Sequence, residues 1–310
     1  MRVPRVVSIG EVLWDLLPSG PQLGGAPANL AVHLHALHNG VTFVSRVGSD
    51  SLGHRALEIL GRRGLDLSGI QTDLKLPTGT VGVEVDPQGQ PSYTIHEGVA
   101  WDSIEPVREA IERVQTADAV VFGTLAQRAN PSRNTIRRLV GTASRSAIRL
   151  CDLNLRKPFF SREQVVDSCR MATVIKLNND ELEEVASWFG WKGSSESQVA
   201  SLVEAFELEE VILTLGSHGS CVWSSGQWLV REASNVTVVD TVGAGDAFTA
   251  AYLSGRLRGL ALTEIHRLAS EVAAFVCTQP GGTPVLPETL TQAFHPSAST
   301  DGIDPGAAHR

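Results

Sequence analysis

The sequence predicts an α/β protein whose mostly parallel sheet is covered by helices on both faces. Three observations predict this: short β-branched apolar runs, helical patterns between them, and one stretch with a different period. Short apolar runs bounded by Gly, Asp or Asn are typical of strands that are buried on both faces. We predict such strands at residues 6–9, 41–44, 119–122, 148–150, 173–177, 211–215 and 220–223.

Helical patterns, in which apolar residues recur at spacings of three and four, separate these runs. We predict helices at residues 27–37, 53–63, 132–142, 180–189, 197–206, 247–257 and 262–277. Because helices alternate with strands, the strands should be mostly parallel. A chain of 310 residues could form one large domain or two ordinary ones. The even rhythm from residue 6 to about residue 287 favours a single domain over residues 1–295.

One stretch, residues 78–95, breaks this rhythm. It reads TGTVGVEVDPQGQPSYTI, in which apolar and polar residues alternate on both sides of a turn at residues 86–89. Alternation predicts a hairpin with one solvated face. This hairpin could cover a site as a flap, or it could simply lie at the edge of a sheet. As a flap, it would belong to a small β lid built from about residues 11–23 and 76–101. The C-terminal tail, residues 296–310, has no periodicity and should be disordered.

Composition excludes several classes of function. The chain has 26 basic and 34 acidic side chains, a net charge of −8, which argues against general binding of nucleic acid. No apolar run approaches the ~20 residues of a membrane helix, so we expect no membrane partner. The four cysteines lie far apart without a CxxC motif, which favours free thiols in a reducing cytosol. We therefore expect a cytoplasmic protein.

The strongest local motif is VDTVGAGDAF at residues 239–248. Its small residues Gly243, Ala244 and Gly245 let the backbone approach a ligand, and the helix that follows would offer unpaired N–H groups to an anion. Asp246 would repel a phosphate, but it could take a proton from an attacking hydroxyl beside that phosphate. An ordinary acidic residue after a glycine-rich turn explains the spacing equally well.

A second glycine cluster, LGGAPAN at residues 23–29, also precedes a helix. Gly24 and Gly25 would allow close approach of the backbone, and Asn29 offers both donors and acceptors to hydroxyl groups. A tight turn with Asn29 in solvent is the alternative. Upstream, Asp15 could accept hydrogen bonds from a polyol near the end of the first strand, where α/β sheets bind their ligands.

Together these motifs resemble the pfkB, or ribokinase-like, family of carbohydrate kinases. The resemblance rests on GGAPANLAVHLHALHNGVTFVSRVGSDSLG near the N-terminus and DTVGAGDAFTAAYLSG about 200 residues later. The segments GEVLWDLLP, GGAPANLA and DLNLRKPFF are most similar to the fructokinase branch. This likeness implies a three-layer αβα ribokinase-like fold and ATP-dependent phosphorylation of a hydroxymethyl group on a small sugar, with fructose as the first candidate.

The resemblance also implies roles for individual residues. Asp246 matches the catalytic base, and the backbone of Gly243, Ala244 and Gly245 matches the anion hole. The positions that contact the sugar are matched by Asp15, Gly24, Gly25, Asn29 and, in the fructokinase branch, Arg156. The nucleotide loop is matched by Thr214, Gly216 and Gly219. Asn178 and Glu181 match a motif that places Mg²⁺ and phosphates largely through water, and Asp240 with residues 279–283 matches a site for a monovalent cation, commonly K⁺.

Several alternatives stay open. Asn178 could cap a helix with Glu181 as its capping-box partner, and Arg156 could pair with Asp152 instead of a ligand. Leu153 replaces a proline of the fructokinase pattern, and His218 stands where many relatives carry lysine. Other substrates are 2-keto-3-deoxygluconate, ribose or a nucleoside.

A non-catalytic sugar sensor is a rival from another class, whereas a dinucleotide dehydrogenase is disfavoured because no GxGxxG follows the first strand. A homodimer could form through the lid strands.

Overall fold

The large sheet has nine strands in the order β13-β12-β11-β10-β9-β8-β1-β4-β5 in a computed structural model that describes residues 2–85 and 91–295. Its strands are β1 (Arg5–Ile9), β4 (Gly40–Gly48), β5 (Ile70–Asp73), β8 (Ala119–Gly123), β9 (Ile148–Asp152), β10 (Val174–Asn178), β11 (Glu210–Thr214), β12 (Ser220–Ser224) and β13 (Gln227–Arg231). All neighbours pair in parallel except β11–β12 and β12–β13. The predicted α/β class with a mostly parallel sheet is confirmed.

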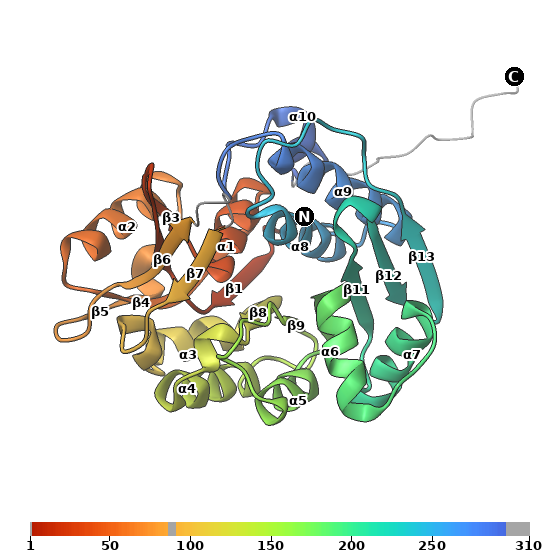
Figure 1. Ribbon diagram of the computed structural model, residues 1–310, viewed down its shortest axis with the longest axis horizontal. Coiled ribbons are helices and arrows are strands. Elements are labelled where there is room, and N and C mark those ends of the chain that lie inside the picture. The colour runs from red at the N-terminus through yellow and green to blue at the C-terminus, as the bar shows by residue number, and fades with distance from the viewer. Residues whose placement is uncertain (1, 86–90, 296–310) are drawn as a thin grey trace, which may run out of the picture.

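Helices cover both faces of this sheet (Figure 1). One core contains residues of α1, α2, α8 and α9, and the other contains residues of α3 to α7. The helices are α1 (Ala26–Ala36), α2 (Ser51–Arg62), α3 (Arg108–Gln115), α4 (Asn130–Gly141), α5 (Arg162–Met171), α6 (Asn179–Phe189), α7 (Ser195–Phe206), α8 (Ala244–Arg256), α9 (Leu262–Cys277) and the short α10 (Glu288–Thr291). Alternate side chains of one strand enter different cores: Val6 joins the first core and Val7 the second.

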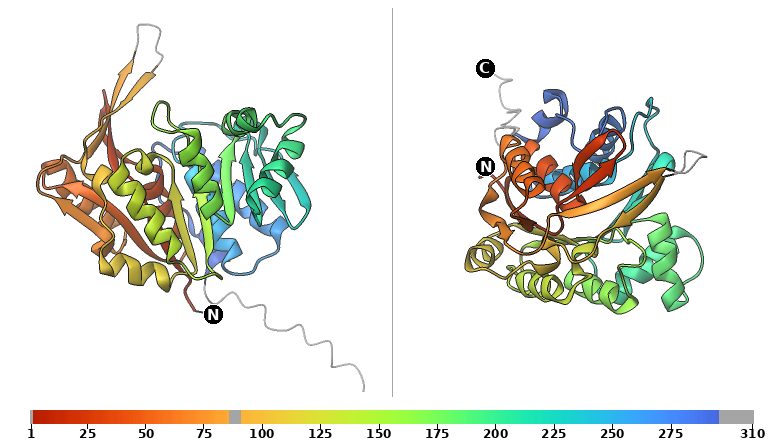
Figure 2. Two further views of the ribbon diagram at one scale, coloured as in Figure 1. Left: turned by 90° about the horizontal axis from the view of Figure 1, so that it is seen from below. Right: turned by 60° about the vertical axis from the view of Figure 1, so that its left-hand side comes forward.

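A second sheet of four strands matches the predicted β lid. Its order is β3-β2-β6-β7, with β2 (Leu13–Leu17), β3 (Gly20–Gly24), β6 (Gly79–Val85) and β7 (Pro91–Ile95). The hairpin β6–β7 pairs through β6 with β2, the strand that carries Asp15, and Figure 2 shows it projecting beyond the large sheet. The hairpin is thus part of a four-stranded sheet with β7 at its edge. The predicted turn at residues 86–89 and the tail at 296–310 lie outside the described residues.

Some elements were not predicted. Helices α3 and α5 are short and rich in charged residues, and each buries few apolar side chains, so few apolar positions mark them in the sequence. Strands β5 and β13 lie at the edges of the sheet, where burial is incomplete. The helix expected from residue 247 begins at Ala244, because Gly243 takes the N-cap position in a left-handed conformation. Asp246 therefore lies in the first turn of α8.

Two further expectations concern the cysteines and the membrane. All four cysteines, Cys151, Cys169, Cys221 and Cys277, are free. Across residues 2–85 and 91–295, no helix combines the length and the hydropathy that a membrane span requires.

Candidate active site

Polar residues gather at the carboxyl ends of the parallel strands, and two of them, Asn178 and Thr214, were predicted from the sequence. Glu11 follows β1, Asp152 ends β9, Asn178 ends β10 and Thr214 ends β11. Parallel strands place their carboxyl ends at one edge of the sheet, where α/β proteins bind ligands. The N-termini of α1 and α8 face the same edge, because Asn29 of α1 contacts Asp246 of α8.

The residues predicted to form an anion hole, Gly243, Ala244 and Gly245, lie at the start of α8, where the Ala244 N–H already donates to the Thr241 carbonyl oxygen over 3.3 Å. The N–H groups of Gly245 and Asp246 have no acceptor within the described part of the chain. Gly243 adopts a φ of 76°, and a Cβ atom there would lie 2.2 Å from the carbonyl oxygen of Gly282. Only glycine fits this position, so the turn and the segment 279–283 pack backbone against backbone. The free N–H groups and the helix dipole make this end of α8 suitable for an anion.

Asp246 is held beside these N–H groups by Asn29. The Asn29 Nδ2 group donates to Asp246 Oδ2 over 2.9 Å, which joins two motifs that are 217 residues apart in sequence. Burial and the nearby charge of Asp152 raise the pKa of Asp246 to about 6, although Asn29, Lys176 and Arg156 oppose this rise. A carboxylate with a pKa near neutral pH is suited to take up a proton from a ligand. Asn29 is buried here, which excludes the solvent-facing turn considered from the sequence.

The residues predicted to contact a sugar lie on the β2–β3 hairpin and at the start of α1, a region called the sugar side below. A Cβ atom on Gly24 would lie 2.7 Å from Asp15 Oδ2, and a Cβ atom on Gly25 would lie 2.6 Å from the Glu11 carbonyl oxygen. Both glycines therefore allow a close approach that other residues would block. Burial raises the pKa of Asp15, and the charge of Arg156 lowers it in part.

Arg156 lies in the loop after β9, near this region. Its side chain is exposed, and its charge acts on the carboxylates of Glu11, Asp15 and Asp246. The alternative pair is not found: among the described residues Asp152 forms its salt bridge with Lys176, whose Nζ atom donates to Asp152 Oδ1 over 3.0 Å, and Arg156 forms none with it. The Arg156 guanidinium is thus available to an anionic or polyol ligand.

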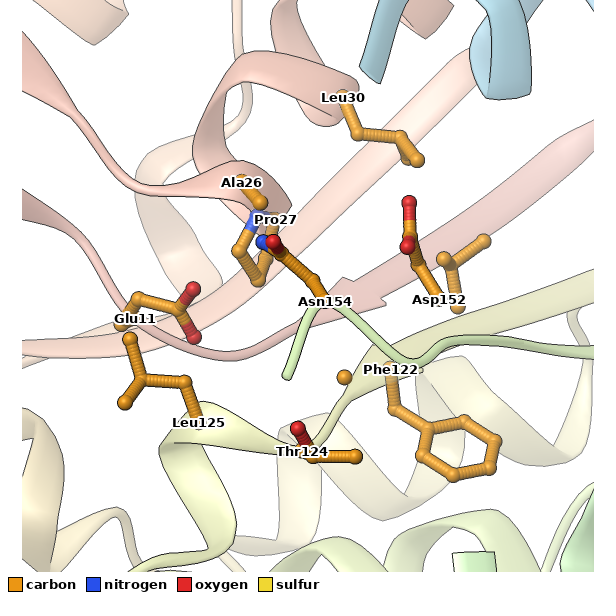
Figure 3. Close-up of a pocket in the computed structure, with 11 residues that line it drawn as sticks. Glu11, Ala26, Pro27, Leu30, Phe122, Thr124, Leu125, Asp152 and Asn154 are labelled. Atoms are coloured by element: carbon orange, nitrogen blue, oxygen red, sulfur yellow. The ribbon is translucent and has the colours of Figure 1, made fainter. Parts of the chain in front are cut away.

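Glu11 belongs to the site but was not singled out from the sequence. It is 3% exposed, and its Oε2 atom has no hydrogen-bond partner among the residues that the structure describes. It lines a small cavity of about 20 Å³ together with Asp152 and Asn154, enough room for one water molecule (Figure 3). Burial and the charge of Asp246 raise the pKa of Glu11 to about 7, against its own backbone hydrogen bond and the charges of Arg156 and Arg128.

This raised pKa predicts that Glu11→Gln stabilises the fold at alkaline pH. The carboxyl has a pKa of about 7 in the fold, against an ordinary value of 4.5. Between these pH values the fold binds more protons than the unfolded chain, so the free energy of unfolding falls as pH rises. We expect Glu11→Gln to raise the free energy of unfolding by about 2–3 kcal/mol at pH 8 and to change it little at pH 4.5.

Urea denaturation at both pH values measures this difference. The exposed Glu97 supplies the matched control, because Glu97→Gln should leave the free energy of unfolding nearly unchanged at both. Equal effects of Glu11→Gln at the two pH values would contradict the assignment of a neutral, buried carboxyl.

The residues predicted to bind the nucleotide line a cleft of about 660 Å³, called the nucleotide cleft below, whose size is typical of sites for small ligands. It brings together the predicted residues Asn178, Thr214, Gly216 and Gly219, and it reaches the backbone of Ala244 and Gly245. His218 is exposed, next to Gly219. Sequence reasoning missed the other wall of the cleft, because the segment 232–238 and the last turns of α9 carry no motif. Their apolar residues include Val236, Val238, Ala273 and Ala274.

Asn178 and Glu181 form the predicted capping box at the start of α6. Asn178 Oδ1 accepts from the Glu181 N–H over 2.9 Å, and Glu181 Oε2 accepts from the Asn178 N–H over 2.8 Å. Glu181 Oε1 also accepts from the Leu155 N–H over 2.7 Å. Both carboxylate oxygens are engaged, which fits contact with a metal through water better than direct ligation. The described residues include no cluster of three or more His, Cys, Asp or Glu side chains that could hold a metal.

Asp240 connects the α8 motif to the segment 279–283. Its Oδ1 atom accepts from the Val242 N–H and its Oδ2 atom from the Gly281 N–H, each over 3.0 Å. His33 supports the same segment from α1, with its Nε2 atom 2.9 Å from the Gly282 carbonyl oxygen. Burial lowers the pKa of His33 to about 4, so the ring is neutral, as expected of a packed helix.

An α/β sheet with a small second sheet, unpaired N–H groups at a helix N-terminus and an adjacent carboxylate is the arrangement expected of a kinase for a small molecule. The model of the pfkB family of carbohydrate kinases matches residues 21–289. The chain belongs to this family, which makes it a sugar kinase, a phosphotransferase with an alcohol acceptor.

Individual relatives agree with this assignment. An uncharacterized sugar kinase of Pyrococcus horikoshii is 30% identical over 289 residues, which cover 87% of this chain and 88% of that protein. Its structure with ATP has a TM-score of 0.78 and covers 90% of this chain and 95% of that chain. The Escherichia coli fructokinase is 29% identical over 301 residues, or 91% and 96% of the two chains. A Xylella fastidiosa fructokinase with bound ATP, 20% identical, has the same fold, with a TM-score of 0.82 over 94% and 97% of the chains.

Proposed function

We propose that the protein transfers the γ-phosphoryl group of ATP to a hydroxymethyl group of a small sugar, with fructose as the first substrate to test. One observation carries the proposal: Asp246 lies beside free N–H groups of α8 and is held by Asn29, between the sugar side and the nucleotide cleft. A base and an anion hole in one helix turn are what phosphoryl transfer to a hydroxyl requires.

In this mechanism the sugar lies between Asp15, Gly25, Asn29 and Asp246, and ATP enters from the Thr214–Gly219 side. Asp246 takes the proton of the attacking hydroxyl. The N–H groups of Gly245 and Asp246 stabilise the charge on the phosphoryl group as it moves. The sequence has no GxxxxGK[ST] motif, so the helix terminus replaces a P-loop in holding phosphate.

Metal ions would assist the phosphoryl transfer, although the described residues form no cluster of side chains that could hold a metal by itself. Mg²⁺, when bound, would neutralise part of the phosphate charge, and Glu181 would hold it through water. A monovalent cation, K⁺ first, would lie near Asp240 and the carbonyls of segment 279–283. Asp240 is already hydrogen-bonded to Gly281 and Val242, so a cation there would stiffen the loop that packs on Gly243.

The choice of fructose rests on the fructokinase-like segments and on relatives that bear that name. The charge of Arg156, close to Asp15 and Asp246, suits a polyhydroxylated or anionic acceptor, so 2-keto-3-deoxygluconate is the next candidate, before ribose and a nucleoside. A non-catalytic sensor is disfavoured, because such a protein has no need for a near-neutral base beside an anion hole.

A substrate panel tests the function. With ATP and Mg²⁺, we expect release of ADP with fructose that exceeds release with 2-keto-3-deoxygluconate, ribose and nucleosides. Replacing K⁺ by a large organic cation should lower the rate if the Asp240 site is used. Turnover with a nucleoside alone would overturn the choice of sugar, and binding of sugar and ATP without any turnover would favour the sensor.

A further inference from the structure

Lys176 is a buried cation whose place in the site the function does not explain. It lies on β10 directly opposite Asp152 of β9, and its Nζ atom is 3.0 Å from Asp152 Oδ1. The side chains of Lys176 and Asp152 are 9% and 8% exposed. A Cβ atom on Gly245 would lie only 3.3 Å from Lys176 Nζ. The ammonium group is therefore wedged between the sheet and the first turn of α8.

This position is unfavourable for a lysine unless a negative charge compensates for it. Burial alone would lower its pKa, and the N-terminus of a helix repels a cation. The carboxylates of Asp152, Glu181 and Asp246 outweigh burial and raise the pKa of Lys176, so the ammonium stays charged. A structural ion pair would need Asp152 alone, and it would not need a place beside the positive end of α8.

The ammonium also has unused donors. A lysine Nζ carries three N–H bonds, and within residues 2–85 and 91–295 Lys176 donates one hydrogen bond, to Asp152. The N–H groups of Gly245 and Asp246, in the turn beside it, are unpaired as well. Unpaired cationic and backbone donors thus converge at one place, which matches the three outer oxygens of a phosphoryl group.

We propose that Lys176 is a catalytic residue that binds the γ-phosphoryl group during its transfer, while Asp152 fixes the direction of the ammonium. This inference rests on the proposed function. As the acceptor oxygen bonds to the γ-phosphorus, the bond from that phosphorus to the bridging oxygen of ADP breaks, and ADP leaves with the electron pair. The hydroxyl proton goes to Asp246. Lys176 keeps its proton throughout and neutralises negative charge on the outer oxygens of the γ-phosphoryl group during its transfer.

The test removes the ammonium without leaving a buried unpaired carboxylate. In the double variant Lys176→Met, Asp152→Asn, kcat with fructose should fall by about 10²–10³-fold, and KM for fructose should change by less than about threefold because Lys176 does not contact the bound sugar. Lys192→Met is the control, since it removes an exposed lysine and should leave kcat unchanged.

Binding gives a second readout that a purely structural role would not move. With fructose present, calorimetry compares the Kd of ADP with that of a non-hydrolysable ATP analogue. The double variant should lose about tenfold of the preference for the analogue, while the Kd of ADP stays within about threefold. Lys192→Met should keep the wild-type ratio of the two Kd values.

The outcomes separate the inference from the function beneath it. Wild-type protein that turns over no sugar would overturn the proposed function itself. An active wild type together with a double variant that keeps both kcat and the ratio of Kd values would overturn the role of Lys176. If the double variant does not fold, Lys176→Gln, Asp152→Asn provides a pair of amides that can hydrogen-bond between the strands, with the same expected losses.

Discussion

Replacing Asp246 by asparagine is expected to lower kcat with the best sugar by about 10³-fold or more, because the reaction loses its general base. The side-chain oxygen of an amide still accepts the hydrogen bond from Asn29, so the geometry of the site should survive. Sugar and ATP should bind with Kd values within about threefold of the wild type. Steady-state kinetics and calorimetry on the same preparations check both expectations.

The wild type adds a test by pH. Because burial raises the pKa of Asp246 to about 6 and the base must be ionised, kcat/KM should fall as pH drops through that value. Asp118→Asn is the matched control: Asp118 precedes β8, pairs with Arg2 at the opposite end of the sheet, and should not affect kcat. Near-normal kcat in Asp246→Asn would refute the assignment of the base.

Gly243→Ala should damage both stability and activity. A methyl group there would lie 2.2 Å from the Gly282 carbonyl oxygen, and the φ of 76° is unfavourable for alanine. We expect a loss of about 2–4 kcal/mol in the free energy of unfolding, part from the left-handed backbone and part from the contact. Since the segment 279–283 must move away from α8, kcat/KM should fall by about 10²-fold or more.

The control Gly259→Ala separates the effect of backbone strain at a positive φ angle from the effect of the steric contact with Gly282. Gly259 has a φ of 68°, but a Cβ atom there would meet nothing within 4 Å. This control should cost about 1 kcal/mol in the free energy of unfolding and leave kcat/KM unchanged. If the two alanine variants have the same activity, the packing of segment 279–283 on Gly243 has no catalytic importance.

Much of the fold could be predicted because the central strands are buried on both faces and read as apolar runs. The lid hairpin was predictable for a different reason, since apolar and polar residues alternate along residues 78–95. Elements at the margin of the fold were missed. Helix α3 buries only Ala110 and Val114, which leaves too weak a pattern to recognise.

The site was predictable where glycine imposes a backbone shape. Gly25 and Gly243 both have positive φ angles beside backbone atoms of other segments, and such positions stand out in sequence. Glu11 and Lys176 were missed because each lies next to or within an apolar strand, where a charged residue carries no spacing signal. Only the structure places them beside Asp246, from strands that are distant in sequence.

For Asn178, the sequence predicted a structural role, as a helix cap, as well as a role in binding the nucleotide. The sequence allowed both a capping box and a phosphate-side role for Asn178 and Glu181, and the structure contains the cap while leaving Asn178 at the wall of the nucleotide cleft. Local hydrogen bonds follow from residue types three positions apart. The position of the pair relative to α8 follows from the sheet order, which no local pattern encodes.

The phosphorus spectrum of the product tests the central claim most directly. Wild-type protein, ATP, Mg²⁺ and fructose should yield ADP and a sugar phosphate whose proton-coupled ³¹P signal is a triplet, because a phosphate on a hydroxymethyl group couples to two protons. Asp246→Asn under the same conditions should yield almost none of this signal. A doublet from a secondary alcohol, or inorganic phosphate as the only product besides ADP, would contradict a kinase that places Asp246 against a hydroxymethyl group.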